Sequence, residues 1–153
     1  MRETLNYHRR PEDFINEGDK LAQVFREDEG KEGDRGHTLA RRAIERYQRA
    51  IQHYQEEGAS ATKLFGCYHK IFSVACEAFR QSASQAREGF YQHLERSFGE
   101  LEKLVQGVQE EAQRSPYAGS RSAADQIKEI FQVEIRPEME RVKEVRMPRL
   151  NRP

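Results

Sequence analysis

The residues best suited to chemistry in this chain are its five histidines and two cysteines, and their spacing limits what they can do. The histidines contain no HxxxH or HExxH pair, the spacing that would place two imidazoles on one helix face for a metal ion. Cys67 and Cys76 are separated by about 180° around a helix, so they cannot form a disulfide within one helix. His69 follows Cys67 by two positions and points to a different side. We therefore expect no metal site, no cofactor and two reduced cysteines, with Cys76 in the core.

Catalytic and phosphate-binding motifs are missing as well. The run EGKEGDRG lacks the GxxxxGK[ST] spacing of a phosphate-binding loop and does not follow a predicted strand. The carboxylate and ExxH pattern of di-iron helical bundles is also absent. We expect no catalytic residues and a protein that is not an enzyme. The remaining enzymatic alternative is a site assembled from residues that are distant in the sequence.

A line of basic side chains is the first candidate binding surface. Arg42, Arg46, Arg49 and His53 lie at i, i+4, i+7 and i+11, which places them on one side of a helix. Such a line could bind an acidic peptide or a phosphate backbone. The competing interpretation is a solvated face. The carboxyl end forms a second basic feature, with Arg141, Lys143, Arg146, Arg149 and Arg152.

Composition sets limits on the class of protein. Of the 153 residues, 36% are apolar and 34% are charged, so the polar surface is large relative to the core. This balance favours an elongated helical body or a core that a partner completes. Basic and acidic residues both number 26, which leaves no overall positive charge for binding nucleic acid or an anionic membrane. No apolar run is long enough to span a membrane, so we expect a cytoplasmic protein, with the nucleus as the alternative.

The elements that must position these residues are all predicted to be helices. Residues 64–79 carry apolar side chains around most of the helix, which indicates a buried central helix. A first helix is expected from Pro11 to about Arg26, and a second from Thr38 to about Glu57. Since only residues 58–60 separate the second helix from the central one, the two should form an antiparallel hairpin. We divide the chain into a flexible arm (1–10), a single helical domain (11–147) with a charged loop (27–36) and a turn (114–121), and a basic tail (148–153).

The second predicted helix carries a resemblance to a known family. In the run AIERYQRAI, Ala43, Tyr47 and Ala50 alternate small and large side chains. This spacing resembles the second helix of a tetratricopeptide repeat and is similar to helices of MIT domains. No second copy occurs at the expected period, and the charged loop interrupts the repeat pattern before the second helix. The resemblance implies a peptide-binding adaptor; the alternative is any closely packed helical hairpin.

The apolar stripe of the central helix continues in phase beyond Phe79. Between Phe79 and Gly89 there is no Pro, Gly, Asn or Asp, so we favour one helix from Ala61 to Gln113; Ser82 and Gln85 offer a capping box for a break instead. From Leu94 the apolar steps alternate four and three, as in a coiled-coil seam. Glu88, Glu95 and Glu102 run beside it. The seam comprises Phe90, Leu94, Phe98, Leu101, Val105 and Val108.

A last helix is expected after a cap at Ser122. Its apolar stripe keeps its phase across Pro137, which predicts a kink at the proline, with a break into two helices as the alternative.

These observations predict an all-α protein in which an antiparallel helical hairpin extends into an elongated three- to four-helix bundle with one long central helix. We expect a protein–protein interaction module, a scaffold or adaptor, that binds a partner helix or acidic peptide. The uncovered seam predicts partner capture or a homodimer. The alternative is a nucleic-acid-associated helical protein that uses the basic stripe and the basic tail. We expect no membrane association.

Overall fold

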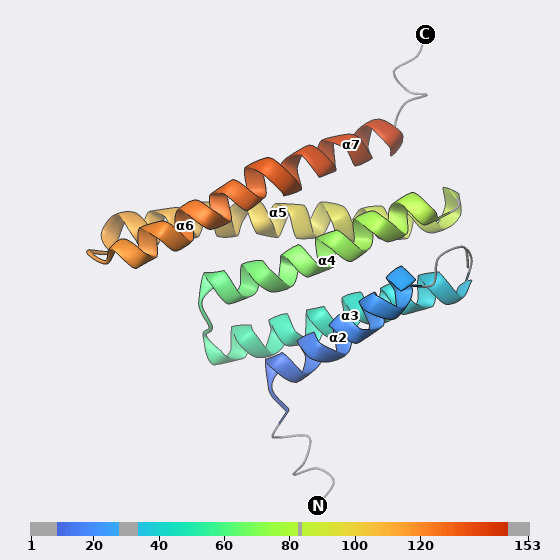
Figure 1. The fold of residues 1–153 in the computed structure, drawn as a ribbon, viewed down its shortest axis with the longest axis horizontal. Coiled ribbons are helices and arrows are strands. Elements are labelled where there is room, and N and C mark those ends of the chain that lie inside the picture. The colour runs from blue at the N-terminus through green and yellow to red at the C-terminus, as the bar shows by residue number, and fades with distance from the viewer. Residues whose placement is uncertain (1–8, 28–33, 83, 147–153) are drawn as a thin grey trace, which may run out of the picture.

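The computed structural model describes residues 9–27, 34–82 and 84–146, and almost all of them are helical. The predicted all-α fold class is confirmed. Figure 1 shows the arrangement. The helices are α2 (Pro11–Glu27), α3 (Asp34–Glu57), α4 (Ala61–Gln81), α5 (Ser84–Arg114), α6 (Ala118–Ile130), the π-helical turn η1 (Phe131–Ile135) and α7 (Arg136–Arg146).

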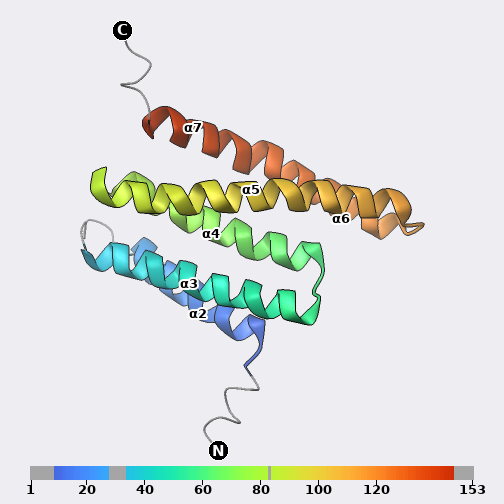
Figure 2. The same ribbon diagram turned by 180° about the vertical axis from the view of Figure 1, so that it is seen from behind.

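From α2 to α6 each helix turns back along the one before it, and η1 and α7 continue α6, so that the chain forms an antiparallel zigzag (Figures 1 and 2). Figures 1 and 2 show the helices in two layers, with α2, α4 and the run α6–η1–α7 on one side and α3 and α5 on the other. Helix α4 lies in the middle, against both α3 and α5. This position explains why the α4 sequence is apolar around most of its circumference.

The hairpin of α2 and α3 depends on a close approach between a glycine and an aromatic ring. A Cβ atom added at Gly18 would lie 2.6 Å from Cε1 of Tyr47. Tyr47 is 2% exposed, and Ala43 and Ala50 on the same face are fully buried. A glycine inside a helix normally costs stability relative to alanine. Here it lets the two helices pack at a distance that no side chain would permit.

Polar contacts also tie α2 to α4. The Tyr47 hydroxyl donates a hydrogen bond to Asp19 Oδ1 at 2.7 Å, and Lys70 Nζ donates to the same oxygen at 2.9 Å. Arg26 Nε lies 2.9 Å from both carboxylate oxygens of Glu77. Tyr47 is buried, but the members of the two ion pairs are partly exposed, so these pairs fix the position of α2 more than they stabilise the fold.

The long central helix is the main error in the predicted fold. Ser82 adopts an extended conformation with ψ of 149°, and α4 ends at Gln81. The chain turns there and α5 runs back along α4. The Ser82 hydroxyl donates to the carbonyl oxygen of Ala78 at 2.5 Å and lies 3.0 Å from His37 Nε2. The physical reason for the turn is burial, because a straight helix would leave the apolar face of α5 in water.

Aromatic packing joins α4, α5 and the last helix. The ring of Phe98 lies with its centroid 6.4 Å from that of Phe72 and 5.2 Å from that of Phe131. Phe72 is buried, and its ring faces Phe98 of α5. The three rings place the last helix across the hairpin of α4 and α5.

Pro137 is accommodated without a break in the last helix. The backbone N–H of Arg136 donates to the carbonyl oxygen of Phe131, an i to i−5 bond, within a π-helical turn that directly precedes the proline. Such a turn redirects the hydrogen bonds that a proline cannot make. The predicted stripe keeps its phase, since Ile127, Phe131, Ile135, Met139 and Val142 are all buried.

Several predicted boundaries shift. Helix α3 begins at Asp34, before the expected cap at Thr38, and α6 begins at Ala118 after an N-cap at Tyr117, not at Ser122. Gly58 ends α3 as expected, with φ of 68°. Residues 1–8 of the predicted arm, 28–33 of the charged loop and all of the tail at 148–153 lie outside the described residues. Within the described ranges, no helix is long and apolar enough to cross a membrane.

Candidate functional site

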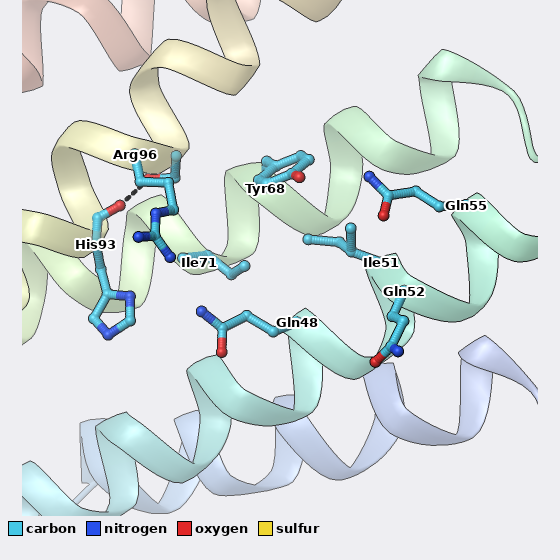
Figure 3. A pocket seen from close by; sticks show the side chains of 9 residues that line it. Gln48, Ile51, Gln52, Gln55, Tyr68, Ile71, His93 and Arg96 are labelled. Carbon is cyan, nitrogen blue, oxygen red and sulfur yellow. Dashed lines mark hydrogen bonds between the residues drawn. The ribbon is translucent and has the colours of Figure 1, made fainter.

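A concave site lies between α3 and α5, with α4 beneath it (Figure 3). Its cavity volume is about 340 Å³. Below, this site is called the central groove. Its lining residues are Gln48, Ile51, Gln52, Gln55, Tyr68, Ile71, His93, Arg96 and Ser97.

One wall of the central groove consists of carboxamides. Gln48, Gln52 and Gln55 follow one another along α3 at steps of four and three, which places them on one side of the helix. All three side chains are exposed. A carboxamide both donates and accepts hydrogen bonds, so this wall can pair with the N–H and C=O groups of a bound backbone.

The floor is apolar. Ile51 and Ile71 are buried, and Tyr68 is half-buried between them and solvent. Burial, followed by the nearby Glu100 carboxylate, raises the pKa of the Tyr68 hydroxyl, which therefore stays protonated as a hydrogen-bond donor at neutral pH. An apolar floor with a few polar groups around it is typical of a binding site.

The opposite wall is cationic. His93 and Arg96 lie one turn apart on α5, and Figure 3 shows Arg96 and Gln48 extending into the groove from opposite sides. Arg96 is exposed, and among the described residues no carboxylate forms an ion pair with it. The Ser97 hydroxyl is not available to a ligand, because it donates to the carbonyl oxygens of His93 at 2.6 Å and Leu94 at 3.2 Å.

The surroundings of the His93 imidazole are positively charged. Burial lowers the pKa of its imidazole first, and the charges of Arg96 and Arg41 lower it further. Arg41 precedes Gln48 by two turns on the same side of α3. None of the residues that line the central groove is acidic, in a chain with as many acidic as basic residues. The arrangement can therefore hold an anionic group above an apolar floor.

The predicted basic stripe lies elsewhere and is largely engaged within the chain. Arg46 Nε lies 2.8 Å from Oε2 of Glu17 in α2. Arg49 pairs with Glu45 at 3.7 Å, and the His53 ring stacks on Phe14 of α2 with centroids 5.1 Å apart. The fourth member of the stripe, Arg42, is exposed. The four residues therefore do not form one free surface, because α2 covers part of the line.

The premise of an uncovered seam is wrong. Phe90, Leu94, Leu101 and Val108 are buried, and Phe98 and Val105 are partly buried, because α5 folds back on α4 and the last helix covers it. Self-association stays a prediction that this seam no longer supports. The predicted glutamate line also has partners within the chain. Glu88 pairs with Arg146 of α7 at 2.6 Å, and Glu102 pairs with Arg136 at 3.7 Å.

Both cysteines are free, and Cys76 lies in the core as expected; Cys67 is buried as well, which was not predicted. Burial raises the pKa of Cys67 to about 11 and that of Cys76 to about 12, so both thiols are protonated at neutral pH and are poor nucleophiles. Among the described residues, no three His, Cys, Asp or Glu side chains are grouped to hold a metal ion.

Sequence reasoning missed the central groove. The signal that could have found it is the line of Arg41, Gln48, Gln52 and Gln55, on a different face of α3 from the predicted basic stripe. In the sequence, however, this line of polar side chains cannot be distinguished from an ordinary solvent-exposed helix face. Only the turn at Ser82, which brings α5 beside α3, places His93 and Arg96 opposite that line.

Comparison with known proteins finds no matching family model, no matching curated protein and no matching solved structure.

Two half-buried histidines predict a pH dependence of stability. Burial lowers the pKa of both His69 and His93, and Glu134, 4.0 Å from His69, offsets only part of this effect. The folded chain therefore binds fewer protons than the unfolded chain below the unfolded histidine pKa of about 6.5. Stability should be fully present above that pH and should decrease as the pH falls toward 5. Urea unfolding at pH 7.5, 6.5 and 5.5 measures this slope.

The matched variant for this prediction carries His69→Gln and His93→Gln together. It should show a smaller loss of stability over the same pH range. The hydrogen bond with Arg146 lowers the pKa of Glu88, so the stability that this carboxylate adds is lost only as the pH falls below about 4.5, outside this window. An unchanged slope in the double variant would contradict the assignment.

Proposed function

We propose that this chain is a protein–protein interaction module that binds an acidic segment of a partner protein in the central groove. The observation that carries the proposal is the composition of the groove, in which His93 and Arg96 face carboxamides across an apolar floor without any acidic lining residue. A groove of this kind binds a chain segment by side-chain burial, backbone hydrogen bonds and charge together.

The packing of the first hairpin supports the same class of function. Ala43, Tyr47 and Ala50, which carry the tetratricopeptide resemblance, are all buried, and Gly18 of α2 lies against the Tyr47 ring. The proposal accordingly is a binding role, in the manner of an adaptor, without catalysis. The basic stripe gives less support to the nucleic-acid alternative, because Arg46 and Arg49 have carboxylate partners within the chain.

Selection from a library of random displayed peptides tests the proposal. The full chain should enrich peptides that carry acidic residues next to an apolar side chain. A synthetic peptide of the enriched sequence should bind the wild-type chain and should lose about tenfold or more of its affinity when Arg96 is replaced by Glu, since charged hydrogen bonds contribute about 1.5–3 kcal/mol.

Arg42→Glu is the matched control. It makes the same charge change on another exposed α3 position that does not line the groove, and it should leave the affinity within about twofold, because distant surface charges are screened. Enriched peptides whose binding ignores Arg96→Glu, or responds equally to Arg42→Glu, would contradict the groove as the site. Binding to duplex DNA that weakens steeply with salt would support the nucleic-acid alternative instead.

A further inference from the structure

The cationic end of the central groove gathers side chains from two helices. The guanidinium carbon of Arg41 lies 5.7 Å from the centroid of the Phe90 ring, so an α3 side chain reaches across to α5. Phe90 precedes His93 by one helical turn, and Arg96 follows His93 by another. Arg41 does not line the groove itself, but its charge acts on His93, which does line it. Arg41, His93 and Arg96 are below called the cationic end.

Apart from Arg96 and His93 itself, the residues that line the groove are uncharged at neutral pH. From α3 the groove residues facing this end are Gln48 and Gln52, and from α4 they are Tyr68 and Ile71, all uncharged at neutral pH. Acidic residues lie near this end but do not line the groove. Glu45 follows Arg41 by one turn of α3 and pairs with Arg46 at 3.6 Å and Arg49 at 3.7 Å, and the Glu100 carboxylate acts on Tyr68. Glu95 is exposed and does not line the groove, and Glu100 lies 3.8 Å from Lys103.

We propose that the cationic end binds a phosphorylated serine or threonine side chain of the partner segment. This inference rests on the proposed function of the central groove and names the chemical group that the groove recognises. A carboxylate carries one negative charge and two oxygens, whereas a phosphate monoester carries about 1.5–2 negative charges near neutral pH and three acceptor oxygens.

Two guanidinium groups and an imidazole match that anion well. Each guanidinium offers a planar fork of N–H donors that fits two phosphate oxygens, and its charge does not titrate near neutral pH. The imidazole adds a third donor, and protonation adds a third charge beside a bound dianion. A single carboxylate would leave most of this positive charge unpaired.

The test follows the imidazole of His93 by NMR in the full chain, with inorganic phosphate and O-phosphoserine as probes and acetate as the carboxylate comparison. A bound dianion favours the protonated ring, so the titration midpoint of His93 should rise and should saturate with increasing phosphate. Acetate at the same ionic strength should produce a much smaller rise. His53, which stacks on Phe14 away from the central groove, serves as the internal reference.

The variant carrying Arg41→Gln and Arg96→Gln should bind phosphate at least about tenfold more weakly, the loss expected for charged hydrogen bonds. Arg42→Gln, at the neighbouring exposed arginine, should bind as the wild type does. A His93 midpoint that does not move with phosphate, moves equally with acetate, or moves equally in the double variant would overturn the proposal.

The source of the phosphate is tested separately. A peptide selected on the central groove should gain affinity when one acidic residue is replaced by phosphoserine, and this gain should disappear in the double variant. If the selected peptides bind but gain no affinity from phosphoserine, the proposed function of the groove would still hold, whereas the proposed phosphate recognition would be overturned. A third outcome is binding to vesicles that contain phosphoinositide. If that binding were lost in the double variant and the phosphopeptide showed no gain in affinity, the ligand would be a membrane lipid, and the proposal of a phosphorylated partner segment would be overturned.

Discussion

Replacing Phe72 by alanine should lower the free energy of unfolding by about 3–5 kcal/mol, the usual cost of removing a buried aromatic ring from a packed core. Phe72 is 2% exposed and contacts the ring of Phe98, which in turn lies against Phe131. The cavity would therefore open where α4, α5 and the last helix meet. Urea unfolding followed by circular dichroism measures the change. It should be a large part of the total stability of the chain.

Val133→Ala is the control for the Phe72 variant. Val133 belongs to the same region of the fold, but its side chain is 64% exposed on the outer side of η1. Its truncation should change the free energy of unfolding by no more than about 0.5 kcal/mol. If Phe72→Ala unfolded at the same urea concentration as the wild type, the assignment of this ring to the core would be wrong.

Gly18→Ala should destabilise the chain by about 1–3 kcal/mol, although alanine is the better helix former. The added methyl group would lie 2.6 Å from Cε1 and 2.9 Å from Cδ1 of Tyr47. The ring has little room to move, because it is buried and its hydroxyl is bonded to Asp19. Thermal and urea unfolding should both show the loss.

The same substitution at Gly66 should have the opposite effect on the free energy of unfolding. Gly66 is exposed on α4, and a Cβ atom there would meet nothing within 4 Å. It should stabilise the chain by about 0.5–1 kcal/mol through helix propensity alone. A second test combines Gly18→Ala with Tyr47→Leu. Because leucine leaves more room for the added methyl group, the double variant should lose less free energy of unfolding than the two single variants together. Equal effects at the two glycines would refute the close approach of α2 and α3.

The fold class and most helix faces could be predicted from the sequence, because amphipathic periodicity is a local property. The face of α3 with Ala43 and Tyr47 is buried as expected, and the stripe of the last helix passes Pro137 in phase. The turn at Ser82 has one local signal, the possible capping box of Ser82 and Gln85, but the absence of Pro, Gly, Asn and Asp between Phe79 and Gly89 favours a continuous helix. The turn follows from the burial of α5 on α4, which is a property of the whole chain.

The candidate site was beyond sequence reasoning for the same cause. The groove combines Gln48 of α3, Tyr68 of α4 and Arg96 of α5, and no pattern along the chain relates these positions before the turn is known. The predicted basic stripe was a real feature of α3. Its role changed because α2 packs beside Arg46 and His53, which only the tertiary arrangement reveals.

The zigzag order of the helices has a consequence for how fast the chain acquires its structure. Each helix packs mainly on its neighbour in the sequence, and the turns within residues 34–82 and 84–146 span only a few residues. Closing such short loops costs little entropy, and helical proteins dominated by local contacts fold within microseconds to milliseconds. The hairpin of α4 and α5 can therefore form early, without waiting for the first or the last helix. Since His93 and Arg96 sit on that hairpin, one wall of the central groove would be in place before α3 docks to complete it.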